Sequence, residues 1–106
     1  MGDRAKGNQG FGIFMFGDVG SGGGGTAEID GNTVRANVLD GIHLAASATG
    51  HDLRYNVSGG TAVQDNGNCE FNVSAGNFNM GGNKANRSNI TGAFGSPFPV
   101  GCLGTP

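Results

Sequence analysis

Charged side chains, tryptophan and long apolar runs are scarce or absent in this chain. Of its 106 residues only 13% are charged, none is tryptophan and one is tyrosine. The six basic residues are scattered along the sequence, so they do not form the cationic stripe that neutralises nucleic-acid phosphates. No run of about 18 apolar residues is present, so no membrane span is expected. We therefore expect neither a nucleic-acid partner nor a membrane partner.

Sequence patterns for catalysis and for metal binding are also missing. His43 and His51 could share a metal only with aspartates such as Asp40, and no pair has the spacing of a zinc or calcium motif. No serine lies in a nucleophile elbow, and Gly22–Gly25 is not followed by the Lys-Ser/Thr pair of a phosphate-binding loop. The sequence thus predicts no enzymatic activity, no metal and no cofactor.

Glycine, by contrast, is abundant, with 23 copies in the chain. An average chain has about 7% glycine. The triplet register of collagen is absent, and a net charge of −2 with period-two apolar residues argues against disorder. A single β-domain with many turns remains.

Alternating apolar and polar residues predict short strands from Thr26 onward. Asp30-Gly31 and Asp40-Gly41 have the composition of type I′ hairpin turns. The prediction is an all-β fold without helix, an antiparallel meander of about seven or eight short strands with glycine-rich turns, forming a small sandwich or barrel. The residues expected to face the core are Val34, Val38, Ile42, Leu44, Leu53, Tyr55, Val57, Phe71, Val73 and Phe78. Those expected to face outward are Asn37, Asn56, Ser58, Asn72, Ser74, Asn77 and Asn79.

A weak repeat offers a second interpretation. An asparagine followed by a β-branched residue recurs at Asn37, Asn56, Asn72 and Asn89. This could indicate a β-solenoid with a coil of about 17 residues, held by stacked asparagines. The irregular spacing and the Asp-Gly turns favour successive hairpins instead.

The N-terminal part has an unusual strand. Its residues Phe11, Ile13, Phe14, Met15 and Phe16 make both faces apolar, and glycines follow at 20 and 22–25. A strand that is apolar on both faces must be covered on both sides, by its own sheet or by another subunit. We divide the chain into this strand with its hinge (residues 1–25) and a β-domain (residues 26–106), and expect the strand to form an assembly interface.

Two questions of chemistry stay open in the sequence. Cys69 and Cys102 could form one disulfide or remain two reduced cysteines, because no signal peptide is visible to identify the compartment. Four Asn-x-Ser/Thr sequons could carry glycans, although a chain so rich in Asn, Ser and Thr also produces them by chance.

The functional prediction is a structural, self-assembling subunit of a virion surface or capsid, or of an extracellular filament. Its partners would be copies of itself and other structural proteins of the same particle. The few charges, the missing catalytic patterns and the doubly apolar strand favour this role. The alternative is a small barrel or sandwich that binds an apolar ligand or a glycan.

Overall fold

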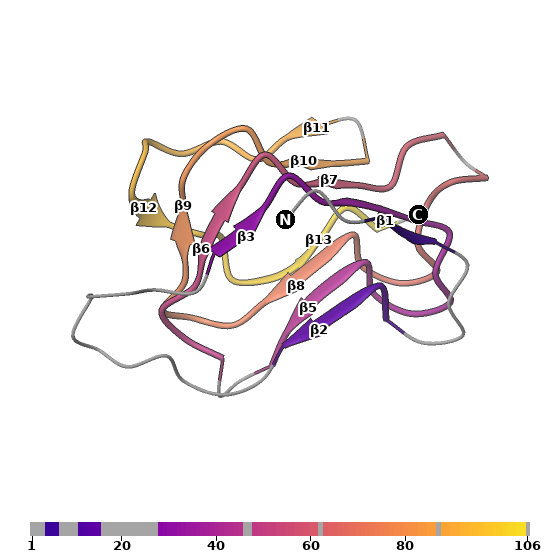
Figure 1. The fold of residues 1–106 in the computed structure, drawn as a ribbon, viewed down its shortest axis with the longest axis horizontal. Coiled ribbons are helices and arrows are strands. Elements are labelled where there is room, and N and C mark those ends of the chain that lie inside the picture. The colour runs from indigo at the N-terminus through magenta and orange to yellow at the C-terminus, as the bar shows by residue number, and fades with distance from the viewer. Residues whose placement is uncertain are drawn as a thin grey trace.

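The structure is a computed structural model of the chain and describes residues 4–6, 11–15, 28–45, 48–61, 63–86 and 88–105. All regular elements within these ranges are β-strands, arranged in three sheets (Figure 1). The predicted all-β class is confirmed, and no helix occurs among the described residues.

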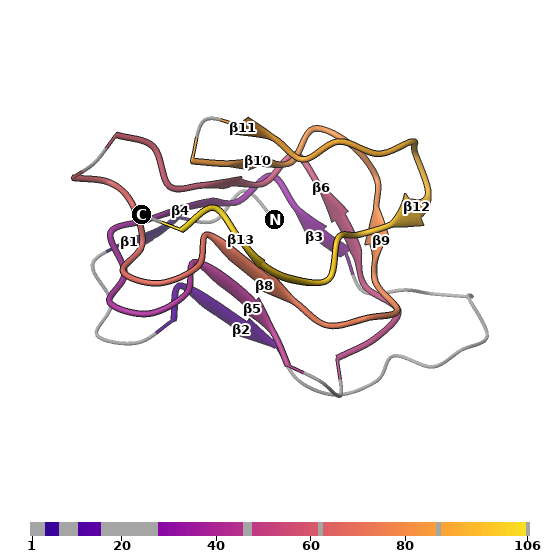
Figure 2. The same ribbon diagram turned by 180° about the vertical axis from the view of Figure 1, so that it is seen from behind.

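Each turn of the chain contributes one strand to each of the three sheets. The first turn contributes β1 (Arg4–Lys6), β2 (Ile13–Met15) and β3 (Glu28–Asp30). The second contributes β4 (Thr33–Arg35), β5 (Ile42–Leu44) and β6 (Asp52–Arg54). The third contributes β7 (Val57–Ser58), β8 (Phe71–Val73) and β9 (Phe78–Asn79). Each strand of the first two turns pairs in parallel with the strand one turn later, so the chain is a three-sided β-solenoid (Figures 1 and 2).

The C-terminal end closes the solenoid with antiparallel strands. After β10 (Lys84–Ala85) begins a fourth turn in parallel with β7, the chain reverses and β11 (Ser88–Asn89) pairs with β10. In the same way β12 (Ser96–Pro97) pairs with β9, and β13 (Gly101–Leu103) pairs with β8. Each sheet therefore runs from a first-turn strand at one end to an antiparallel strand at the other.

The core consists of apolar columns formed by side chains in register. Ile42 lies beside Phe71 and Leu44 beside Val73, and all four are fully or almost fully buried. Phe98 closes the core, with its ring centroid 5.4 Å from that of Phe71. Short strands suffice here because every turn stacks its apolar residues on those of the next.

Asparagine ladders hold the corners between the sheets. The Oδ1 of Asn56 accepts hydrogen bonds from the backbone N–H and the Nδ2 of Asn32, and the Oδ1 of Asn83 accepts the same pair from Asn56. Asn66 accepts the same pair from Asn37. Each bond joins one turn to the next, and the sequence separations are 24, 27 and 29 residues.

A third corner uses a histidine in the same role. His51 donates its backbone N–H to the Oδ1 of Asn77, and its Nδ1 lies 3.1 Å from the same oxygen. Because that oxygen can only accept, Nδ1 carries the proton. His51 is 1% exposed, so it is part of the interior.

Backbone conformation explains why these polar residues point inward. A residue with positive φ comes directly before almost every ladder residue: Ala36 before Asn37, Tyr55 before Asn56, and glycines before Asn32, His51, Asn77 and Asn83. The left-handed residue breaks the period-two alternation, so that the next side chain turns into the corner.

The antiparallel meander is therefore wrong, and so is a sandwich or barrel. Gly31 has positive φ, as a hairpin would require, but its N–H binds the carbonyl of Arg54 on the next turn. The N–H of Gly41 likewise binds the carbonyl of Cys69. These turns are corners of a coil. The solenoid alternative identified the architecture, although its coils are longer than about 17 residues and its ladders join different asparagines.

The predicted inward and outward sets hold in β4, β5, β6 and β8, whereas β7 and β9 have the opposite face inward. Val34, Ile42, Leu44, Leu53, Phe71 and Val73 are buried as expected, and Val57 is half-buried. Three residues expected in the core are exposed: Val38 (51%) and Tyr55 (62%) near corners, and Phe78 (38%) in β9. Five residues expected outside are buried: Asn37, Asn56, Ser58, Asn77 and Asn79. Asn72 and Ser74 are half-buried.

Candidate functional site

The two ends of the solenoid differ. At the C-terminal end the outermost strands are antiparallel, β11 and β12 have two residues each, and β12 contains Pro97, which has no N–H to donate. At the other end the outermost strands are β1, β2 and β3, each with three residues and without proline. Among the described residues, each of these strands is the last one in its sheet.

The first-turn end is a candidate docking site because an edge strand presents its N–H and C=O groups in the arrangement that pairs with another strand. Successive amides of a strand point to opposite sides. Ile13 donates its N–H to the carbonyl of Gly41 in the second turn, so one side of β2 pairs with β5. Within the described part of the chain, no strand pairs along the other side of β2.

An aromatic cluster marks this end of the sheet that contains β2. The outward row of the sheet runs from Phe14 through His43 and Asn72 to Cys102. The Phe14 ring stacks on the His43 ring with centroids 5.1 Å apart and planes 4° from parallel. Phe11 completes the cluster, 4.8 Å from Phe14 and 4.7 Å from His43. Phe14 is 45% exposed, which is high for a phenylalanine.

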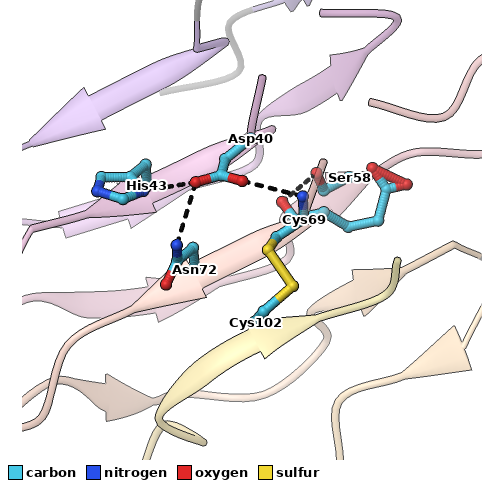
Figure 3. The surroundings of a disulfide bond; sticks show 7 residues. Asp40, His43, Ser58, Cys69, Asn72 and Cys102 are labelled. Atoms are coloured by element: carbon cyan, nitrogen blue, oxygen red, sulfur yellow. Dashed lines mark hydrogen bonds and ion pairs between the residues drawn. A yellow bond between two sulfur atoms is a disulfide. The ribbon is translucent and has the colours of Figure 1, made fainter. Parts of the chain in front are cut away.

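A buried carboxylate orients the polar members of the row. Asp40 is 2% exposed, and its Oδ2 lies 2.6 Å from His43 Nδ1 and accepts a hydrogen bond of 3.2 Å from Asn72 Nδ2. Its Oδ1 accepts the backbone N–H of Cys69 at 2.9 Å. Figure 3 shows the carboxylate between His43 and Asn72 on one side and Cys69 on the other. Asp40 thereby fixes the plane of the imidazole against which Phe14 stacks.

The disulfide lies beside this anchor. Cys69, which precedes β8, is bonded to Cys102 of β13, with Cα atoms 5.3 Å apart (Figure 3). The bond ties the antiparallel closing strand to the third turn of the coil. The sequence left the state of these cysteines open, and the structure pairs them.

A second buried carboxyl group lies on the inner side of the same corner. Glu70 is fully buried, and its Oε1 accepts hydrogen bonds from the backbone N–H and the Nδ2 of Asn66. Its Oε2 has no hydrogen-bond partner among the residues that the structure describes. Burial raises the pKa of the Glu70 carboxyl, the two bonds from Asn66 lower it, and nearby Asp65 raises it further.

The structure places the predicted interface residues as follows. Phe11 and Phe14 belong to the aromatic cluster, and Ile13 packs against the core. Met15 lies in β2 as part of the backbone ladder, and Phe16 falls outside the described residues. One edge of β2 pairs with β5 of the same chain, so β1 and β2 belong to the same sheets as the rest of the molecule. Contact of the other edge with another chain stays a prediction.

Three residues of the site were not singled out as members of one cluster: Asp40, His43 and Asn72. Asp40 was assigned to a hairpin turn and considered as a metal partner of His43, and Asn72 was assigned to the outward-facing set. A turn aspartate three residues before a strand histidine is the signal that could have joined the first two. Among the described residues, no group of three or more acidic, histidine or cysteine side chains could hold a metal ion.

No helix long and apolar enough to cross a membrane occurs in the described part of the chain. Neither a protein-family model, nor a curated protein sequence, nor a solved structure matches the chain.

Proposed function

We propose that this chain is a structural subunit that assembles through the first turn of its solenoid, where the described strands of each sheet end. The observation that carries the proposal is the asymmetry of the two ends. Antiparallel strands, a proline and a disulfide close one end, whereas three parallel edge strands form the other. Edge strands of this kind pair readily with strands of another chain.

The aromatic cluster supports the same site. A partner strand added to β2 would lie about 4.8 Å away and would place its outward side chain beside Phe14. Stacked planar side chains then continue the row that Phe14 and His43 begin. Because Asp40 holds the imidazole in place, Phe14 meets a partner in a prepared orientation.

The difference between the two ends of the solenoid also supports one kind of particle, a virion or a filament, over the other. A filament that grows along the solenoid axis needs an accepting surface at both ends of each subunit. A subunit that accepts a partner strand at one end only forms closed pairs, or attaches to the end of another β-structure. This favours a component of a virion surface, with an extracellular filament as the second possibility. The disulfide fits a virion or extracellular location, where disulfides persist.

The test replaces Phe14 by lysine and measures association by sedimentation over a range of concentrations. Two-fold pairing of the open ends brings the two substituted edge strands together, so that like charges oppose one another. We expect the association constant to fall at least about tenfold, equivalent to about 1.4 kcal/mol. The fold should survive because Phe14 is 45% exposed.

The matched control is Val100→Lys, which places the same charge on an exposed apolar residue between β12 and β13, at the other end of the solenoid. It should leave association unchanged. Equal loss in both variants would show that the added charge, and not its position in the first turn, weakens association. Unchanged association in Phe14→Lys would contradict the proposal.

The apolar-ligand alternative finds less support. The phenylalanines that could line one cavity lie in different parts of the molecule: Phe71 is in the core, Phe14 is in the outward row, and Phe94 is 71% exposed with the guanidinium of Arg54 5.8 Å from its ring centroid. They do not form one apolar site.

A further inference from the structure

A cavity of about 310 Å³ lies at the closed end of the solenoid, opposite the assembly site. Residues around β10 and β11 form one wall and residues around β13 form the other. Its volume is at the lower end of the range for small-molecule sites, roughly 300–1,000 Å³.

The cavity arises because the inward-facing side chains become small toward the C-terminal end in one sheet and stay large in the neighbouring sheet. In one sheet the column runs from Val34 through Ser58 and Ala85 to Ser88, so that small side chains replace a large one toward the C-terminal end. In the neighbouring sheet the column keeps large residues and ends at Leu103. Since the chain reverses after β10, no complete fourth turn fills the space between the two columns.

The lining divides into an apolar wall and a polar wall. Ile90, Pro99 and Leu103 provide the apolar surface, and Ile90 and Leu103 also pack against the buried core. Ser88, Asn89 and Thr91 provide hydroxyl and amide groups, and these three residues are exposed. None of the lining residues that the structure describes carries a charge.

We propose that this cavity binds a neutral saccharide unit. A sugar ring has an apolar C–H face and a rim of hydroxyl groups, which match the apolar wall and the hydrogen-bonding wall respectively. An ionic ligand would find no opposite charge on the described lining. A purely apolar ligand would displace water from the hydroxyl and amide groups without replacing those hydrogen bonds.

This site goes beyond the proposed assembly and is independent of it, because its residues come from β10, β11 and β13 and not from the first turn. A subunit joined through one end would therefore present a saccharide site at the other end.

The experiment records amide NMR spectra of the full chain during titration with neutral probes. The saccharide probes are glucose, galactose, mannose, N-acetylglucosamine and disaccharides of these sugars, glucuronate is the acidic probe, and benzene is the apolar probe. We expect at least one neutral saccharide to shift the signals of residues 88–91 and 103, whereas glucuronate and benzene leave them unchanged.

Two substitutions localise the effect. Thr91→Val keeps the shape of an exposed side chain but removes its hydroxyl group, and it should weaken saccharide binding about tenfold. Thr61→Val is the matched control, because Thr61 is exposed in the loop between β7 and β8 and does not line the cavity. Phe14→Lys should leave saccharide binding unchanged, so that failure of assembly and failure of this site remain distinguishable.

Three results would overturn the proposal. One is that no saccharide of the panel shifts the signals of the cavity residues. Another is that benzene binds there more tightly than every saccharide, which would assign the cavity to apolar ligands. The third is that Thr91→Val and Thr61→Val bind a saccharide equally well.

Discussion

Replacing Asn56 by alanine should remove about 4 kcal/mol from the free energy of unfolding. Asn56 is fully buried, and its side chain makes four hydrogen bonds between turns. The Oδ1 accepts two from Asn32, and the Nδ2 donates one to the Oδ1 of Asn83 and one to the carbonyl of Ile29, both at 2.8 Å. At about 1 kcal/mol net for each bond, the loss is a large part of a typical stability of about 5–15 kcal/mol.

The control for this variant is Asn72→Ala. Both positions were predicted to face outward, but Asn72 is half-buried and donates a hydrogen bond of 3.2 Å to Asp40. Its loss should cost about 1 kcal/mol or less. Urea denaturation of both variants, monitored by circular dichroism, measures the difference.

The stabilising role of the asparagine ladder would be refuted if Asn56→Ala lowered the free energy of unfolding by less than about 1 kcal/mol, the range of an exposed position. Equal costs at both positions would also refute it, because the argument depends on which of the two asparagines lies inside the coil.

Three further predictions concern the core and the closed end. Phe71→Ala should cost about 3–5 kcal/mol in urea denaturation, since the side chain is fully buried, and a cost below about 1 kcal/mol would contradict that burial. Because the pKa of the Glu70 carboxyl is raised in the folded state, stability should fall as pH rises from the ordinary glutamate value through the raised one. Glu70→Gln should remove this slope in denaturation curves recorded at several pH values, and a slope unchanged by the substitution would exclude Glu70 as its source. Reducing the Cys69–Cys102 bond, which spans 33 residues, should cost about 3–4 kcal/mol, whereas a melting temperature that is insensitive to reductant would show that the bond contributes little.

The inward faces of β4, β5, β6 and β8 could be predicted from the sequence, because alternation within a strand depends only on local residues. Those of β7 and β9 could not, because each of these strands follows a residue with positive φ and a ladder asparagine. Val34, Ile42 and Phe71 were assigned to the core correctly for this reason. The direction of pairing could not be predicted. An Asp-Gly pair such as Asp30-Gly31 provides positive φ equally well for a hairpin and for the corner of a coil, and the choice depends on contacts one turn away.

The corners were unpredictable for a further reason. Ala36 and Tyr55 adopt positive φ without being glycine or asparagine, which alanine and tyrosine rarely do. Nothing in the local sequence indicates this, so the alternation was carried through the corner and Asn37 and Asn56 were placed outside. A usable signal was the Gly-Asn pair at positions 31–32, 76–77 and 82–83, which marks three of the ladder residues.

The candidate site could be predicted in part. The apolar segment around Phe14 identified the end of the molecule that carries it, but not the buried Asp40 behind His43. Asp40 and His43 are only three residues apart, whereas Asn72 reaches Asp40 through the parallel pairing of β5 with β8, which the sequence did not predict.

Amide hydrogen exchange of the full chain at low and at high concentration tests the assembly account most directly. If subunits pair through the first turn, the amides of β2 (Ile13–Met15) should become more protected as concentration rises. Those of β8, which lies two strands away in the same sheet, should keep the same exchange rate. Association without added protection in β2, or exchange that is independent of concentration everywhere, would contradict the account.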